Sequence, residues 1–221
     1  MNIILNLVEA RVLGCLIEKA VTTPEYYPLT LSALTAACNQ KSNRDPVIQT
    51  DEKNLVRAID SLRDKKLVSS IALAGSRTPK YRHSLPDILV LTPRQQAVLC
   101  ELILRGAQTA GELRSHAVRM VPFTDTHEVE SVLDELSAWP GGPLISKLPR
   151  QIGQREERYA HRLCGEISTE ATEPHPALEP ARVTVMVENE RIAALETRMA
   201  ALGDELERLK AQFADFAKQF Q

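Results

Sequence analysis

The most chemically varied stretch of the sequence is ACNQKSNRDP, residues 37–46, which follows an apolar helical pattern and turns abruptly polar. It holds no nucleophile with a positioned general base, so it is not typical of a catalytic site. In one interpretation it is a helix end and a turn, in which polar side chains bond nearby backbone and Pro46 disfavours helix before it. In the other, Lys41, Asn43 and Arg44 also contact a nucleic acid or a protein. The sequence leaves both interpretations open.

More cations and amides follow this stretch. A helix is predicted after Thr50, because apolar side chains recur there every three or four residues on one face. Its outer face and the hairpin beyond it carry groups that can neutralise phosphates or read base edges. Interleaved carboxylates such as Asp51, Glu52 and Asp60 would repel a phosphate backbone. The predicted contacts for nucleic acid or a partner are Lys41, Asn43, Arg44, Lys53, Asn54, Arg57, Arg77, Lys80 and Arg82.

Signatures of common catalytic centres are not found in the sequence. There is no P-loop, dinucleotide fingerprint, G-x-S-x-G elbow or HExxH pair. Tyr81 with His83, and Tyr159 with His161, resemble acid–base or metal-binding pairs, but their alternation better fits one strand face with locally hydrogen-bonded imidazoles. The four cysteines form no CxxC pair, and three lie in helical apolar patterns as small buried hydrophobes. We therefore predict a protein that is not an enzyme and that has no metal or cofactor.

A repeated unit is expected to position these residues. Three predicted helices and a β-type hairpin span residues 1–86, and the same order returns in residues 87–164. The closing strands also repeat, since Tyr159 follows Tyr81 by 78 positions. Three helices and a hairpin are the order of a winged helix. We predict a mainly α fold with small β-hairpin wings, in the α+β class, made of tandem winged-helix (helix-turn-helix) modules and a C-terminal coiled-coil helix. Helix-capping patterns mark the starts of helices in both copies: Asn6 with Glu9, Thr92 with Gln95, Thr109 with Glu112, and Asp125 with Glu128.

The end of the chain has a different composition. Residues 165–182 are rich in Pro and Glu and predict a flexible acidic linker. Over residues 183–221, apolar side chains step by three and four positions, which is typical of a coiled coil. We expect this helix to form a homo-oligomer, with a dimer favoured; the alternatives are packing on the rest of the chain or on another protein. The predicted seam contains Ile192, Leu195, Met199, Leu202, Leu206, Leu209, Phe213 and Phe216.

The net charge of −2 conceals an uneven distribution. Residues 1–85 hold 12 Lys and Arg against 8 Asp and Glu, a balance of +4, whereas residues 165–221 hold 6 against 11, a balance of −5. Attraction to phosphate therefore belongs to the first third of the chain. No apolar run approaches the roughly 20 residues that cross a bilayer, and the N-terminus lacks a signal-peptide pattern. We expect a cytoplasmic protein without membrane contact.

The sequence contains the motifs EARVLGCLIEK, TTPEYYPLTLSALTAACNQKSNRDPV, KYRHS, RGAQTAGELRSHAVRM and LPRQIGQREERYAHRL. These motifs closely resemble those of the YceH family of bacterial proteins. The likeness covers roughly residues 5–164, and its motifs are long and specific. It implies a tandem winged-helix fold and a bacterial cytoplasmic setting. It implies no activity, because the family is catalogued as a domain of unknown function.

Two functions of different classes fit this organisation. DNA binding is the common use of a winged helix, although a fold alone does not fix a function. The third helix of the second copy offers Glu128, Glu130 and Asp134 and no Lys or Arg, so the first copy should carry any duplex-DNA contact. The alternative is a protein–protein interaction or scaffold module with no nucleic-acid binding. DNA binding of the transcription-regulator type is the preferred interpretation.

Overall fold

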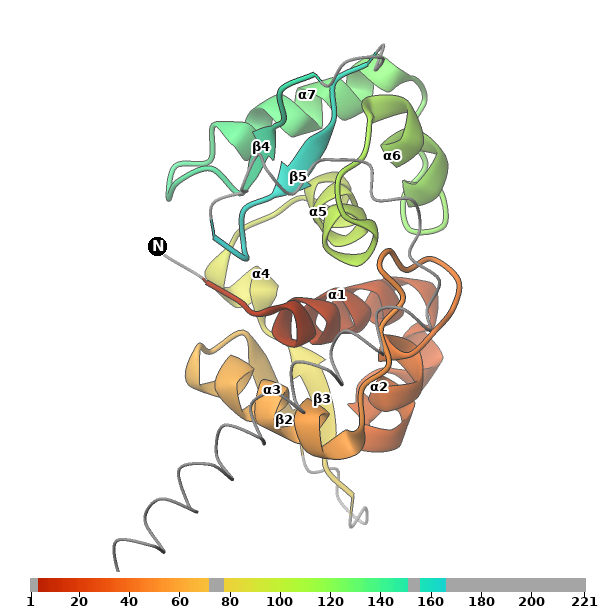
Figure 1. The fold of residues 1–221 in the computed structure, drawn as a ribbon, viewed down its shortest axis with the longest axis vertical. Helices are drawn as coiled ribbons and strands as arrows, with labels where there is room; N and C mark the ends of the chain where they lie inside the picture. The colour runs from red at the N-terminus through yellow and green to blue at the C-terminus, as the bar shows by residue number, and fades with distance from the viewer. Residues whose placement is uncertain (1–3, 72–77, 151–155, 166–221) are drawn as a thin grey trace, which may run out of the picture. The chain divides into compact units, whose positions relative to one another are not determined.

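The first half of the chain folds into three main helices and a small sheet (Figure 1). The computed structural model describes residues 4–71, 78–150 and 156–165. The sheet has the order β1-β3-β2, and both strand pairs are antiparallel. In chain order the elements are α1 (Leu7–Thr22), the 3-10 turn η1 (Pro24–Tyr26), β1 (Leu29–Thr30), α2 (Leu31–Cys38), α3 (Glu52–Asp64), β2 (Val68–Ile71) and β3 (Lys80–His83).

The second half repeats three helices followed by a hairpin. A short helix leads into it, and its two strands pair antiparallel. The elements are α4 (Leu85–Ile88), α5 (Pro93–Arg105), α6 (Ala110–Ala117), α7 (Thr126–Ser137), β4 (Ile145–Lys147) and β5 (Tyr159–His161). The α+β class that the sequence predicts is confirmed, and the element order of each half is that of a winged helix.

The strand that precedes the second helix shows the internal likeness most clearly. In the first half Leu29 pairs with Tyr81 of β3. In the second half an isolated antiparallel bridge joins Gln108 to Tyr159 of β5. Each of these segments then leads directly into a threonine-capped helix. The two tyrosines identified from the sequence therefore occupy equivalent places in the two halves.

Helix starts follow the capping patterns of the sequence. Full capping boxes, with reciprocal side-chain and backbone bonds, are present at Asn6, Thr92 and Thr109. Asp125 caps α7 through the amide of Glu128. In α3 the cap is Asp51, which accepts from the Asn54 amide, so this helix begins one residue later than Thr50 would place it. Local chemistry therefore explains where most of the helices begin.

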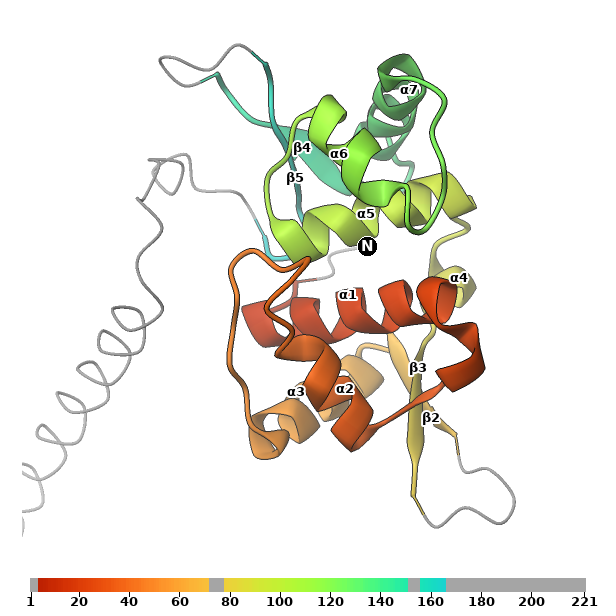
Figure 2. The same cartoon turned by 90° about the vertical axis from the view of Figure 1, so that its right-hand side faces the viewer.

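Helices α1 and α5 join the two halves. They lie side by side in both views (Figure 2), and their apolar residues belong to one continuous core. The approach is close at Gly14, where an added Cβ would lie 2.8 Å from side-chain carbons of Ile103 and Leu104. Both halves belong to one compact unit, Met1–Ala171. Within the described ranges, no helix combines the length and apolar character needed to cross a membrane.

The closing strands differ from the sequence expectation in two respects. The alternation of Tyr81 and His83 predicts Leu85 as the next position of the same strand, but β3 ends at His83 and Leu85 opens α4. The imidazoles of His83 and His161 do not find the expected bond through Nδ1, which is buried without a partner among the described residues. Burial lowers the pKa of each histidine to about 4, so both imidazoles are neutral at pH 7.

Candidate functional site

Arg44 lies in the interior of the protein, so its predicted role as a surface contact is wrong. Its side chain is 0 % exposed, and its Nη2 lies 2.5 Å from Glu18 Oε2 on α1. Nη1 donates to the other carboxylate oxygen at 3.0 Å, which completes a bidentate pair. Nε and Nη2 also donate to the carbonyl of Ala37. The guanidinium is fully used inside the fold and cannot reach a nucleic acid or a partner.

The residues around Arg44 attach the 37–46 stretch to both halves. The side-chain oxygen of Asn43 accepts from Arg105 of α5. The Asp45 amide donates to the Leu104 carbonyl at 2.9 Å, and the Pro46 carbonyl accepts from Arg11 at 2.6 Å. The turn interpretation therefore explains residues 43–46, where Asn43 is half-buried and committed to α5. Of the predicted contacts in this stretch, only Lys41 remains exposed.

Two buried carboxylates, which the sequence reasoning missed, extend this arrangement into a charge cluster. Glu18 pairs with Arg119 as well as with Arg44. Arg119 lies 2.7 Å from Glu101 of α5, and Arg105 lies 3.1 Å from the same carboxylate. Burial opposes ionisation of Glu18, but the hydrogen bonds and charges of its arginine partners outweigh it and hold the pKa of Glu18 below its usual value. We call Glu18, Arg44, Glu101, Arg105 and Arg119 the buried charge cluster.

The outward face of α3 carries the predicted contacts that remain available. Leu55, Ala58, Ile59 and Leu62 of this helix are buried, which turns the opposite face, with Val56, to solvent. Lys53, Asn54 and Arg57 are exposed on that face. Within the described part of the chain, no ion pair involves Lys41, Lys53 or Arg57. We call Lys53, Asn54 and Arg57 the α3 cationic face; Lys41, in the segment between α2 and α3, is also exposed.

Carboxylates reduce the positive charge of this helix. Glu52, Asp60 and Asp64 are exposed on α3, as the sequence indicates. Asp60 is paired with Arg63 at 3.2 Å. A phosphate backbone would therefore be attracted by the N-terminal part of the outward face, where Lys53 and Arg57 lie one turn apart.

The hairpin of the first half contributes less than the sequence predicts. Lys80 is half-buried on the central strand β3. Arg82 is exposed, but its Nε donates to Ser69 Oγ at 3.0 Å and its Nη2 lies 4.0 Å from Asp87. Arg77 lies outside the described residues. In its described part, the hairpin therefore offers one exposed cation, Arg82, which is already hydrogen-bonded.

The corresponding helix of the second half has the opposite charge. Helix α7 contains no Lys or Arg, and His127, Glu130, Asp134 and Glu135 are exposed on it. In the described part of the neighbouring hairpin, Lys147 and Arg150 are both paired with Glu157. Because the exposed face of α7 carries carboxylates and no Lys or Arg, it does not attract phosphate.

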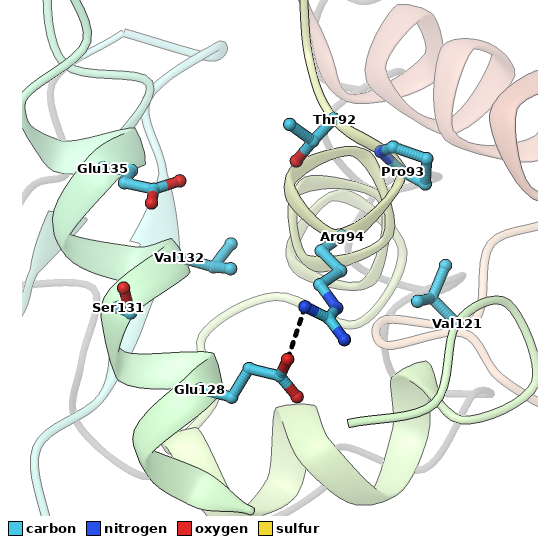
Figure 3. Close-up of a pocket in the computed structure, with 8 residues that line it drawn as sticks. All are labelled: Thr92, Pro93, Arg94, Val121, Glu128, Ser131, Val132 and Glu135. Atoms are coloured by element: carbon cyan, nitrogen blue, oxygen red, sulfur yellow. Dashed lines mark ion pairs between the residues drawn. The ribbon is translucent and has the colours of Figure 1, made fainter. Parts of the chain in front are cut away.

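A groove of about 480 Å³ lies between the start of α5 and α7 (Figure 3). In this view Arg94 points across it to Glu128, and the two groups pair at 2.5 Å. A second link joins Gln95 Nε2 to Glu135 Oε2 at 2.6 Å. Apolar Val121 and Val132 lie on opposite walls. The groove thus combines an apolar lining with exposed carboxylates.

The other predicted features have separate outcomes. Cys15, Cys38 and Cys100 are buried and Cys164 is exposed, and all four are free thiols. In the described ranges, no group of three potential metal ligands comes together. The seam predicted between Ile192 and Phe216 lies outside the described residues.

Comparison with known proteins gives the family of the chain. A family model described as "Protein of unknown function, DUF480" matches residues 5–154. UPF0502 proteins of Geotalea uraniireducens and Geobacter sulfurreducens are each 53% identical over 221 residues and cover 100% of both chains. A UPF0502 protein of Vibrio parahaemolyticus is 46% identical over 216 residues, or 96% of this chain and 97% of the relative. These matches confirm the resemblance read from the motifs. The chain belongs to the DUF480 family.

Proposed function

We propose that this member of the DUF480 family binds duplex DNA through the α3 cationic face, without enzymatic activity, as transcription regulators do. The observation that carries the proposal is the group of exposed cations at the start of α3, none of which is engaged in an ion pair among the described residues. Lysine and arginine at such positions release counterions from DNA, and Asn54 adds a group that can bond an adenine edge. The winged-helix order of the first half supports the same use of its third helix.

Charge reversal on α3 tests the proposal directly. A labelled duplex of mixed sequence is titrated at low salt with the parent protein and with a K41E/K53E/R57E variant. Because three phosphate-facing cations become anions, we expect affinity to fall by at least about tenfold. No binding by the parent, or equal binding by the variant, would contradict the proposed DNA binding.

A matched control separates local contact from total charge. R114E/K147E/R150E changes the net charge by the same amount on exposed residues of the second half. This control should bind within a small factor of the parent, since α7 carries no Lys or Arg and the two hairpin cations that it changes are already paired with Glu157. Circular dichroism of both variants verifies that each remains folded.

A second function is favoured by a specific observation, the acidic groove beside α7. Its apolar walls and exposed carboxylates suit a basic, partly apolar segment of another protein. Retention of partners from a native lysate after nuclease treatment, lost in an E135K variant whose changed side chain lines the groove, would favour this scaffold function. Partners that are retained only before nuclease treatment would favour DNA.

Oligomerisation through residues 183–221 is part of the proposal. The heptad pattern of the sequence supports it. Removing these residues should lower the mass measured by light scattering, with a dimer as the expected parent state. An unchanged mass would move self-association to the rest of the chain.

A further inference from the structure

Two buried thiols from different helices lie next to each other beside the buried charge cluster. Cys15 is on α1 and Cys38 ends α2, and both are 0% exposed. Cys15 Sγ lies 3.4 Å from the carbonyl oxygen of Ala37, the residue directly before Cys38. The two thiols also act on each other's pKa, as neighbouring groups do. The fold therefore holds a dithiol that the spacing along the chain does not reveal.

Arginines supply positive charge around Cys15. Arg44 Nη2 lies 3.5 Å from Cys15 Sγ. Arg11, one turn earlier on α1, is 2% exposed and bonds Pro46 through Nη2 alone, while its Nε and Nη1 have no partner among the described residues. Burial lowers the pKa of Arg11, while negative charge on Cys15, and to a smaller extent on the exposed Asp45, would raise it. This excess of buried cations favours negative charge on the sulfur of Cys15.

The two thiols differ in acidity in a way that follows from these contacts. Burial raises the pKa of Cys15, but the neighbouring thiol of Cys38 and the charge of Arg44 outweigh burial and lower it below the usual value. The pKa of Cys38 is raised, chiefly by the neighbouring Cys15 and then by burial. Cys15 is thus the nucleophile of the pair, and Cys38 keeps its proton.

We propose that Cys15 and Cys38 form a redox-modification site at which a peroxide converts the dithiol into a disulfide. The Cys15 thiolate attacks one oxygen of hydrogen peroxide, the O–O bond breaks, and the departing oxygen leaves as water after taking up a proton. The resulting sulfenic acid is attacked by the sulfur of Cys38, which forms the S–S bond and releases a second water. The two thiols lose two electrons in total, and one peroxide is reduced to two waters.

The disulfide would change the surroundings of Arg44. Its Nη2 loses the thiolate beside it, although the pair with Glu18 remains. The same arginine anchors residues 43–46 to α1, and these residues are also bonded to α5. The oxidation state of the dithiol therefore affects the contact between α1 and α5. Neither sulfur is exposed, so peroxide reaches the thiols only when the fold opens locally around them. The rate of disulfide formation therefore reports how often this opening occurs.

Peptide mapping of the oxidised full-length protein tests the site. The protein is treated with hydrogen peroxide, alkylated under denaturing conditions and digested with trypsin without reduction. Cleavage after Lys19 separates Cys15 from Cys38, so a linked pair of peptides identifies their disulfide. We expect this linked pair to be the main intramolecular product. Oxidation of the exposed Cys164 shows that peroxide has acted on the protein. If Cys15 and Cys38 are both still recovered as alkylated thiols at that point, the proposal is overturned.

Single variants test the assigned roles. In C38S the resolving thiol is absent, so Cys15 should accumulate as a sulfenic acid that dimedone labels; in C15S, Cys38 should stay unlabelled. The variant R11M removes a cation beside Cys15 and should slow disulfide formation several-fold, with oxidation of Cys164 unchanged as the internal reference. Dimedone labelling of Cys38 in C15S but not of Cys15 in C38S would contradict the order of attack.

Discussion

Arg44 and Arg57 are cations of the same half that the sequence assigns to one contact surface, and the fold separates them completely. Arg44 is 0% exposed and bonded to Glu18, whereas Arg57 is exposed on α3 and has no ion pair among the described residues. Arg44 therefore belongs to the contact between the two halves, and Arg57 belongs to the solvent-exposed face of α3. Residue type and local spacing do not distinguish these roles, because the partner of Arg44 lies on a helix distant in the chain.

Helices α3 and α7 extend the comparison to the two halves. They occupy equivalent places in the element order, yet α3 exposes Lys53 and Arg57 while α7 exposes Glu130 and Asp134. The two halves therefore share an order of elements but differ in the charge of this outward helix face. The buried positions fix the fold, and the exposed positions are where the two halves can differ in function.

The largest expected effect is on stability, from breaking the buried pair. In R44M the carboxylate of Glu18 loses its bidentate partner in the interior, so the free energy of unfolding should fall by about 3–5 kcal/mol. The matched variant R57M should stay within about 0.5 kcal/mol of the parent, because its side chain is exposed. Urea unfolding followed by circular dichroism measures both. Equal losses in the two variants would contradict the separation of roles.

Next in size is the close approach of the halves. In G14A the new methyl group would lie 2.8 Å from carbons of Ile103 and Leu104, and overpacking of this kind costs about 1–3 kcal/mol. The control G111A, whose nearest neighbour is an oxygen 3.9 Å away, should be neutral or slightly stabilising. Thermal unfolding of the two variants compares them. A G14A protein as stable as G111A would show that the α1–α5 contact is looser than described.

The pH dependence of stability should reflect the two buried histidines. Each has a folded-state pKa of about 4, below its ordinary value of 6.5, so the unfolded chain binds protons more readily. Their contribution is fully present above pH 6.5 and is lost as the pH falls from 6.5 towards 4. The H83Q/H161Q variant should show a flatter stability curve over that window. A parent whose unfolding midpoint does not move between pH 7 and pH 5 would contradict the burial of these imidazoles.

The smallest expected effect comes from exchanging charge on α7. In E130K/D134K the second half gains the kind of outward charge that α3 has, and DNA affinity at low salt should rise by a few-fold. The control E130Q/D134N removes repulsion without adding attraction and should give a smaller gain. Fluorescence anisotropy with one labelled duplex compares the three proteins. An affinity unchanged by either variant would mean that α7 stays remote from the bound duplex.

Much of the fold could be predicted from local sequence. The capping boxes at Asn6, Thr92 and Thr109 formed as their patterns indicate, and the repeated tyrosines located equivalent strands. The short elements η1, β1 and α4 were not predicted, because two to four residues carry too little periodicity to be recognised. Their place is set by tertiary pairing, such as that of Leu29 with Tyr81.

The candidate site was predicted less completely, for a physical reason. Arg44 became internal because Glu18, 26 positions away, presents its carboxylate on the buried side of α1. Glu101 likewise lies among the buried residues of α5, three positions from Val98 and from Leu104. A carboxylate on a core-facing position signals a buried cation somewhere in the chain. Only the packing of α1 on α5 identifies which arginines supply it.

The salt dependence of DNA binding is the most direct test of the central claim, that the α3 cationic face contacts duplex phosphates. Affinity of the parent and of K53Q/R57Q is measured against one duplex over a series of salt concentrations. For the parent we expect the logarithm of the affinity to fall linearly with the logarithm of salt, and for the variant a slope smaller by about 2, because each phosphate contact contributes about 0.9. Parallel lines for the two proteins, or no saturable binding by the parent at low salt, would contradict it.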